Sequence, residues 1–123
     1  MSAQYNRTVF LVDDDEPVRD SLKTLLESYC MPVEDYPSCP EFLEHFKAED
    51  GGCLVLDLHL PVMSGLEFME TYGTRLKDMP VILITGFADS AKLDAITSAS
   101  VTILRKPFES HELLRHIRRV ARH

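Results

Sequence analysis

The stretch VFLVDDDEP (residues 9–17) decides the fold that we expect for this chain. Its four leading apolar residues are typical of a strand buried on both faces, as strands are in parallel sheets. The run then stops in carboxylates and a proline, which favour the first turn of a helix because acidic groups suit the positive end of the helix dipole. The stretch therefore predicts a β-strand followed directly by an α-helix.

The same strand-then-helix unit recurs along the chain. Apolar runs predict further strands at 53–56, 81–84 and 101–104, and a weaker strand at 33–36. Prolines flank the 33–36 run, so we expect it at an edge of the sheet. Strands that alternate with helices predict the α/β class. At this chain length we expect a doubly wound five-stranded parallel sheet of flavodoxin-like order 2-1-3-4-5, flanked by five helices.

The helices are expected to bury apolar residues that lie three and four positions apart. We expect Asp15 to begin the first helix rather than to bind a ligand, and Gly65 to ease a tight loop before the third helix. In the first helix, the inward-facing residues are predicted to be Val18, Leu22, Leu25, Leu26 and Tyr29.

Composition and charge narrow the class of protein. The 123 residues suit a single domain (1–123), with residues 1–7 expected as a short flexible lead-in. No apolar run approaches the length that spans a bilayer, so we expect a cytoplasmic protein without membrane contact. A net charge of −7 would repel phosphate backbones and argues against direct nucleic-acid binding by this chain. Cys30, Cys39 and Cys53 lack metal-binding spacing and are expected to be reduced fillers.

Polar residues stand where the predicted strands end. Asp13 and Asp14 follow the first strand, Asp57 the third, Thr85 the fourth and Lys106 the fifth. Ligands of doubly wound sheets bind beyond the carboxyl ends of the strands, so we expect these side chains to meet at one edge of the sheet.

Carboxylates gathered at one edge repel each other and stay ionised together only when a cation offsets the repulsion. Oxygen ligands favour a hard cation such as Mg²⁺. A carboxylate can also act as a nucleophile and form an acyl phosphate, while Lys106, the Thr85 hydroxyl and the Gly86 N–H can hold phosphoryl oxygens. The pattern therefore predicts Mg²⁺-assisted phosphoryl transfer, which depends on positioning and electrostatics.

Four motifs together resemble the receiver domain of two-component response regulators, a CheY-like superfamily. The resemblance runs from about Thr8 to about Val120, and the stretch TGFAD (85–89) is similar to FixJ-type transcription regulators. The motifs are VDDDEPVR (12–19), LDLHLPVMSG (56–65), ITG (84–86) and RKPF (105–108).

The resemblance implies roles for the acidic residues. Asp57 would be the phosphoacceptor. Asp14 would bind Mg²⁺ directly, Asp13 would act largely through water, and the backbone carbonyl of His59 would be a further metal ligand.

It implies roles for the remaining motif residues as well. Thr85 would follow the phosphoryl group, Lys106 would pair with it, and Pro107 would follow a cis peptide bond. We further hypothesise that Phe87 and His59 set the lifetime of the acyl phosphate. Ile103 departs from the family, which carries Tyr or Phe there as a rotameric switch, so coupling through that position would work by packing alone.

The resemblance also implies partners. The phosphoryl donor would be a sensor histidine kinase or a phosphotransfer protein, and the chain would be a switch rather than a turnover enzyme. Phosphorylation would change its interaction surface to control a C-terminal or separate output domain, with homodimerisation as one route and transcription regulation as the expected output.

Three alternative functions fit these residues less well. A phosphatase of the haloacid-dehalogenase class wants Asp-x-Asp, but His59 stands at the second position. A flavin or nucleotide binder on the same fold would need a glycine-rich phosphate loop after the first strand, where three aspartates stand instead. A degenerate receiver that serves only as an interaction module would normally have lost an active-site residue, and none is lost.

Overall fold

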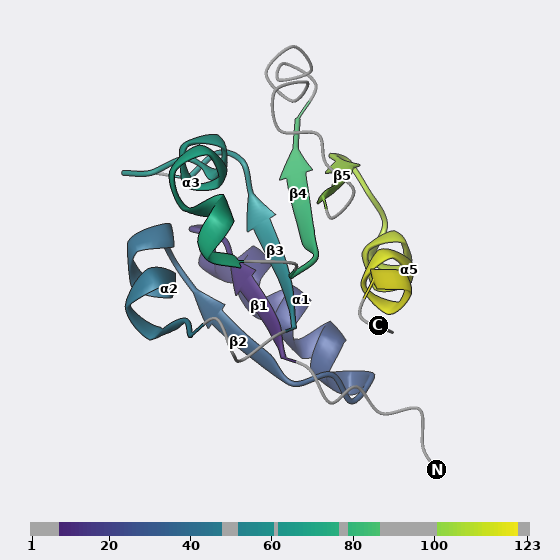
Figure 1. Cartoon of the computed structure of the whole chain (residues 1–123). Coiled ribbons are helices and arrows are strands. Elements are labelled where there is room, and N and C mark those ends of the chain that lie inside the picture. Colours follow the sequence, from purple (N-terminus) through teal and green to yellow (C-terminus); the bar gives the residue numbers. More distant parts are fainter. Residues whose placement is uncertain (1–7, 48–51, 61, 77–78, 87–100, 121–123) are drawn as a thin grey trace.

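A five-stranded parallel sheet in the order β2-β1-β3-β4-β5 forms the centre of the computed structural model (Figure 1). This confirms the predicted strand order and the edge position of the proline-flanked strand. The strands are β1 (Val9–Val12), β2 (Val33–Tyr36), β3 (Cys53–Asp57), β4 (Val81–Thr85) and β5 (Val101–Arg105). The structure describes residues 8–47, 52–60, 62–76, 79–86 and 101–120.

Four α-helices and a short 3₁₀ helix, η2, lie in the described residues. The fourth of the five expected helices falls within 87–100, outside those residues. The helices are α1 (Glu16–Ser28), α2 (Cys39–His45), α3 (Gly65–Tyr72), η2 (Gly73–Leu76) and α5 (Ser110–Val120).

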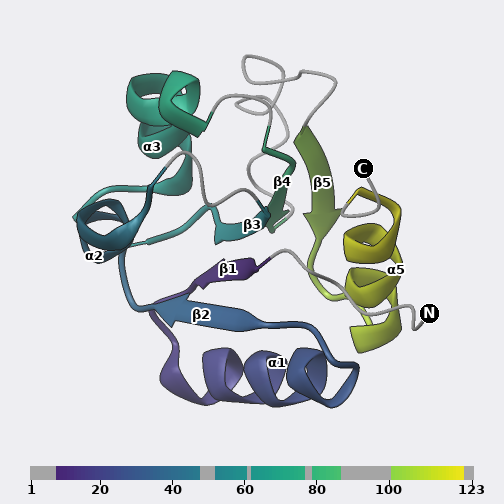
Figure 2. The ribbon, with the colours of Figure 1, turned by 60° about the horizontal axis from the view of Figure 1, so that its bottom comes forward.

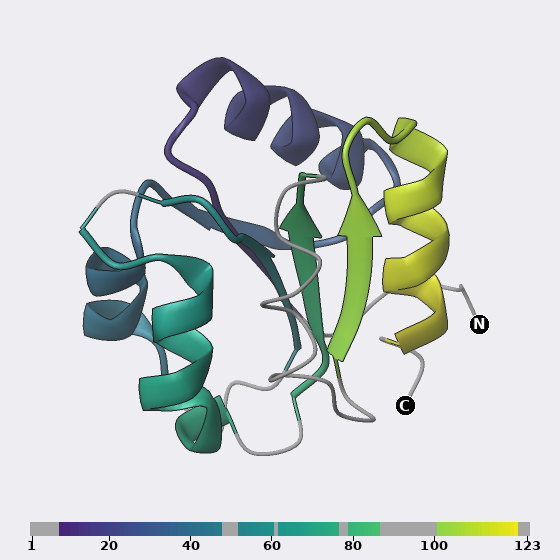
Figure 3. The same cartoon turned by 90° about the horizontal axis from the view of Figure 1, so that it is seen from above.

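The helices cover both faces of the sheet. Figures 2 and 3 show α1 and α5 on one side of the sheet and α2 and α3 on the other. Successive residues of β1 alternate between these layers, as the two-residue period of a strand requires. Val9 and Leu11 pack in the core under α1 and α5, whereas Phe10 and Val12 pack in the core under α2 and α3. A strand covered on both sides must be apolar throughout, which explains the continuous run.

The inward face of α1 differs from the prediction. Leu22 and Leu26 are buried as expected, but Val18 is 42% exposed and Tyr29 is 46% exposed. The buried stripe begins instead at Arg19, because a step of 3.6 residues per turn places positions 19, 22 and 26 on one side. Tyr29 lies at the end of the helix. The predicted positions 18 and 29 were therefore wrong.

The helix starts are fixed by side chains that accept backbone hydrogen bonds. Asp15 is the N-cap of α1 and accepts from the Val18 N–H at 3.3 Å, which confirms its expected helix-starting role. Ser64 caps α3 in a reciprocal capping box with Glu67.

Val62, in the loop before α3, has a strained backbone. Its φ is 69° and its residue surface is 87% exposed, although β-branched side chains strongly disfavour the left-handed region. We expect Val62→Gly to raise the free energy of unfolding by about 1 kcal/mol, because relief of the strain exceeds the cost of a more flexible unfolded chain. Urea unfolding beside the exposed-site control Val18→Ala measures this, and a destabilised Val62→Gly would contradict it.

Candidate functional site

The sheet register brings the strand-end residues together. Val12 of β1 pairs with Leu56 of β3, so the residues that follow them, Asp13 and Asp57, are neighbours at the carboxyl edge. In β4, Thr85 pairs with Arg105 of β5, immediately before Lys106. The pairing of the strands therefore brings these residues to one edge of the sheet, as the sequence predicts.

An acidic cluster occupies this edge. Asp13, Asp14 and Asp57 each offer a carboxylate oxygen, and these oxygens lie within 4.8 Å of one another. Asp13 and Asp57 are buried, at 3% and 5% exposure, whereas Asp14 is exposed. A donor set of carboxylate oxygens with one solvent-facing member fits a hard cation that keeps part of its water shell, so the residues present suit Mg²⁺.

The position of Asp13 in this cluster changes the pKa of its carboxyl group. Burial raises the pKa of its carboxyl above the ordinary value, and the negative charges of Asp57 and Asp14 raise it further. The hydrogen bond from the Asp15 N–H and the positive charge of Lys106 act in the opposite direction. A divalent cation at the cluster would offset the repulsion that these carboxylates impose on one another.

Both oxygens of the Asp57 carboxylate are engaged. The His59 N–H donates to Oδ1 at 2.9 Å, and the Lys106 Nζ donates to Oδ2 at 3.2 Å. The Lys106 side chain is 50% exposed while that of Asp57 is 6% exposed, so the lysine reaches into the edge from solvent. The backbone contact of His59 was missed by the sequence reasoning, although an Asp that bonds to the N–H two residues later is a common local pattern.

Thr85 ties β4 to the residues after β5. Its backbone carbonyl accepts from the Lys106 N–H at 2.7 Å, and its hydroxyl donates to the Gly86 carbonyl at 3.2 Å. The Lys106–Pro107 bond is cis, as the resemblance implied. Phe87 lies outside the described residues.

Gly65 permits a close approach between α3 and the end of β3. A Cβ at this position would lie 2.8 Å from the Asp57 carbonyl oxygen and 2.9 Å from the Leu58 Cα, both of them backbone atoms. The Gly65 N–H also donates to the Leu58 carbonyl at 2.9 Å. The glycine therefore serves packing against the site, whereas the sequence had suggested only an easier loop.

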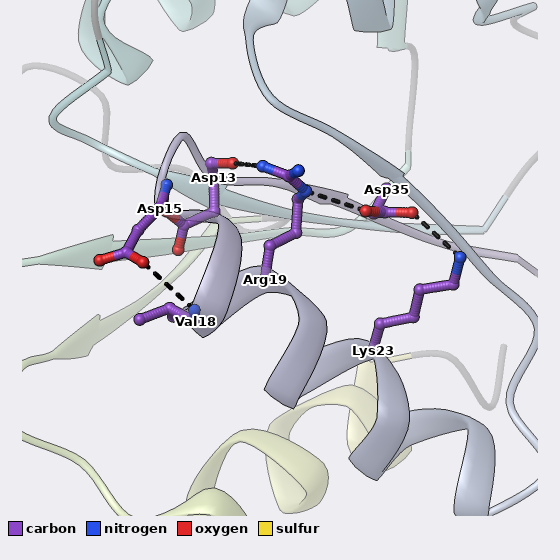
Figure 4. A network of polar contacts seen from close by, with 6 residues as sticks. All are labelled: Asp13, Asp15, Val18, Arg19, Lys23 and Asp35. Carbon is purple, nitrogen blue, oxygen red and sulfur yellow. Dashed lines mark hydrogen bonds and ion pairs between the residues drawn. The ribbon is translucent and has the colours of Figure 1, made fainter.

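A partly buried ion-pair network adjoins the cluster and was also missed. Arg19 of α1 donates from Nη1 to the Asp13 carbonyl at 2.7 Å and from Nε to Asp35 Oδ2 at 2.9 Å (Figure 4). Lys23 donates to the other Asp35 oxygen at 3.1 Å. The available signal was an arginine at a position of α1 that shares the helical stripe of Leu22 and Leu26.

The network predicts a pH-dependent contribution to stability. Burial alone would raise the pKa of Asp35, but the hydrogen bonds and charges of Lys23 and Arg19 outweigh it and lower that pKa. A folded-state pKa below the unfolded value of about 3.9 contributes stability that is present above that value and is lost as pH falls through the folded-state pKa.

We therefore expect Asp35→Asn to be less stable than the wild type at neutral pH, by about 1–2 kcal/mol, and the difference to shrink in acid. Comparing the two chains cancels the opposite trend of Asp13, whose pKa is raised. Urea unfolding from neutral pH to about pH 3 measures the difference. A difference that stays constant over this range would show that Asp35 is not stabilised as an ion.

The sequence of this chain matches that of a known protein family. Residues 9–118 match the family described as the response regulator receiver domain. The chain belongs to this family.

Relatives of this receiver domain are signalling proteins rather than turnover enzymes. Transcriptional regulatory protein FixJ of Rhizobium meliloti (strain 1021) is 36% identical over 117 residues, covering 94% of this chain and 57% of the relative. Response regulator protein TodT of Pseudomonas putida is 34% identical over 111 residues, covering 89% of this chain and 49% of the relative. The chain thus spans about half the length of the curated relatives that it matches.

A solved structure called FixJ-N has the same fold. It superposes with a TM-score of 0.81 at 36% identity and covers 96% of this chain and 95% of its own. Within the described part of this receiver domain, no helix has both the length and the apolar character needed to cross a bilayer. Ile103, the departure from the family pattern, lies in β5 opposite Leu83 of β4 and is partly exposed.

Proposed function

We propose that this receiver domain is a phosphorylation-activated switch, which accepts a phosphoryl group onto Asp57 from a sensor histidine kinase or phosphotransfer protein in a Mg²⁺-dependent reaction. One observation carries the proposal. The carboxylate of Asp57 lies 3.2 Å from the ammonium group of Lys106 and belongs to an acidic cluster with oxygens within 4.8 Å of one another. This edge therefore has a nucleophile, a cation for the incoming phosphoryl oxygens, and oxygen ligands for a metal.

In the proposed reaction the phosphoryl group moves from an imidazole nitrogen of the donor to a carboxylate oxygen of Asp57. A carboxylate oxygen of Asp57 forms a bond to phosphorus while the bond from phosphorus to the donor imidazole nitrogen breaks, and the electron pair of that bond returns to the nitrogen. The His59 N–H restrains the rotation of the carboxylate through Oδ1. Lys106, which pairs with the carboxylate before transfer, donates to a phosphoryl oxygen afterwards.

The carboxylates would hold the metal. In this proposal the exposed Asp14 binds the metal directly, and Asp13 acts largely through water. Asp57 and the backbone carbonyl of His59 would be further metal ligands. Bound Mg²⁺ supplies neutralisation of the charge on the transferring group. The chain itself supplies the orientation of the carboxylates and the buried surroundings of Asp13 and Asp57.

The proposed conformational response begins at Thr85, the last residue of β4. The Thr85 hydroxyl bonds to the Gly86 carbonyl, and we propose that it turns to a phosphoryl oxygen and moves the loop that begins there. Ile103 has no ring to swing, so any coupling through β5 acts by packing. His59 and Phe87 are proposed to set the lifetime of the acyl phosphate.

The changed surface would control an output domain or a separate partner, or would promote homodimerisation. Transcription regulation is the proposed output because relatives named transcriptional regulatory proteins match this chain. We place the protein in the cytoplasm, without direct nucleic-acid or membrane contact by this domain.

The experiment is phosphoryl uptake from a small-molecule phosphodonor, followed by intact mass, with Mg²⁺ or with excess EDTA. We expect a gain of one phosphoryl group that needs Mg²⁺ and is lost in alkali. No uptake from small donors or phosphohistidine donors, together with no Mg²⁺-dependent beryllofluoride binding, would contradict the proposal. The domain would then be an interaction module that is not phosphorylated.

A further inference from the structure

Arg19 is a buried cation with two kinds of partner. Its side chain is 11% exposed, and burial of a charge requires compensation. Asp35 compensates the charge through Oδ2 at 2.9 Å, while Nη1 donates to the Asp13 carbonyl at 2.7 Å in a buried hydrogen bond. Figure 4 shows the guanidinium lying between the Asp13 backbone and the Asp35 carboxylate. Arg19 therefore links β2 to the residue that follows β1.

The bond to the Asp13 carbonyl fixes more than one atom. A peptide unit is planar, so its carbonyl, its N–H and the two flanking Cα atoms move together. Holding the Asp13 carbonyl therefore orients the N–H and Cα of Asp14. Asp13 is restrained at two further atoms, because its N–H donates to the Tyr36 carbonyl at 3.1 Å and its Oδ1 accepts from the Asp15 N–H at 2.9 Å.

Charge explains why Arg19 needs Asp35. An unpaired guanidinium beside three carboxylates would weaken the attraction of the cluster for a metal ion. Asp35 offsets that charge, and Lys23 holds the second Asp35 oxygen at 3.1 Å from the far side. The pairing thus fixes the guanidinium as a hydrogen-bond donor to Asp13 and places a negative charge beside it.

We propose that Arg19, held by Asp35, is a positioning residue for the cation site, because it fixes the peptide unit between Asp13 and Asp14 and so the direction of the two carboxylates. The inference rests on the proposed function, since it assigns a support to the same metal site. Arg19 touches neither the ion nor the phosphoryl group in this proposal, and it acts only through the backbone of Asp13.

The test compares Arg19→Met and Arg19→Lys with Arg115→Met, which removes the same charge from an exposed position on α5. We expect Mg²⁺ affinity, measured by calorimetry, to fall about 10-fold in Arg19→Met and to change little in the control, as for other outer supports of metal ligands. Arg19→Lys keeps the charge but lacks the planar guanidinium that bonds to both partners at once. Its loss of Mg²⁺ affinity should therefore be smaller than that of Arg19→Met.

Two readouts separate positioning from general stability. In the metal-free proteins, hydrogen exchange of the Asp15 N–H should be faster in Arg19→Met than in the control, because its acceptor on Asp13 is less well held. The Mg²⁺ concentration for half-maximal phosphoryl uptake should rise about 10-fold, with the rate at saturating Mg²⁺ within about 3-fold of wild type. If Arg19→Met does not fold, Arg19→Lys decides on the same readouts.

The failures are distinguishable. Wild-type binding of Mg²⁺ with equal affinity in the Arg19 variants and in Arg115→Met would overturn the inference and leave the proposed function standing. A wild type that binds no Mg²⁺ would overturn both.

Discussion

Replacing Lys106 with Met is expected to slow phosphoryl uptake by about 10²-fold, the usual loss when one charged or hydrogen-bonding group is removed from a transition state. The Lys106 Nζ lies 3.2 Å from Asp57 Oδ2, so its positive charge is in direct contact with the proposed phosphoacceptor. Met keeps a long, unbranched side chain but has no ammonium group. The fold should persist, because the Lys106 N–H still donates to the Thr85 carbonyl.

Mg²⁺ binding by the same variant gives the matching control. The positive charge of Lys106 opposes a second cation at the cluster, so Lys106→Met should bind Mg²⁺ at least as tightly as the wild type while it transfers more slowly. Stopped-flow or quench kinetics at saturating Mg²⁺ measure the rate, with Arg115→Met as the charge-matched comparison. A rate within about 3-fold of wild type would refute the role of Lys106 in transfer.

Replacing Phe42 with Ala is expected to lower the free energy of unfolding by about 3–5 kcal/mol, because a buried aromatic ring leaves a cavity. Phe42 lies on α2 and is fully buried. Its ring centroid lies 5.6 Å from that of Phe10 on β1, 5.0 Å from that of Phe46, and 5.9 Å from that of Phe68 on α3. The ring therefore packs α2 and α3 against β1, the strand that Asp13 and Asp14 follow.

Urea denaturation measures the loss in Phe42→Ala. The control Val18→Ala truncates an apolar side chain that is 42% exposed, and it should change the free energy by no more than about 0.5 kcal/mol. A loss below about 1 kcal/mol in Phe42→Ala would mean that the cluster under α2 repacks and does not hold the layer in place.

The central strands β1, β3 and β4 were the most predictable, because each is buried along its whole length and covered on both faces. Such a strand reads as an unbroken apolar run, and the residue where the run stops marks the functional edge. The sequence alone therefore predicts that Asp57 and Thr85 lie at the same edge of the sheet. Helix α1 was less predictable, because its inward stripe contains Arg19, which a rule based on apolar spacing assigns to solvent.

The contacts around the cluster lay beyond sequence reasoning for a related reason. Arg19 and Asp35 are separated by 16 positions and meet only after β1 and β2 pair, so neither residue alone signals the ion pair. Gly65 looked like loop chemistry because a sequence does not show how closely two backbones approach. The chemical roles of all the site residues stay predictions that experiments must test, namely those of Asp13, Asp14, Asp57, the His59 carbonyl, Thr85, Phe87 and Lys106.

Locating the phosphoryl group is the measurement to make first. Wild type, Asp57→Asn and Asp20→Asn, which alters an exposed carboxylate on α1, are incubated with Mg²⁺ and a small-molecule phosphodonor, and the masses of the intact chains and of their proteolytic fragments are determined. We expect one alkali-labile phosphoryl group in wild type and in Asp20→Asn, on the fragment that contains residue 57, and none in Asp57→Asn. Equal Mg²⁺-dependent uptake by Asp57→Asn would contradict the assignment of Asp57 as the phosphoacceptor.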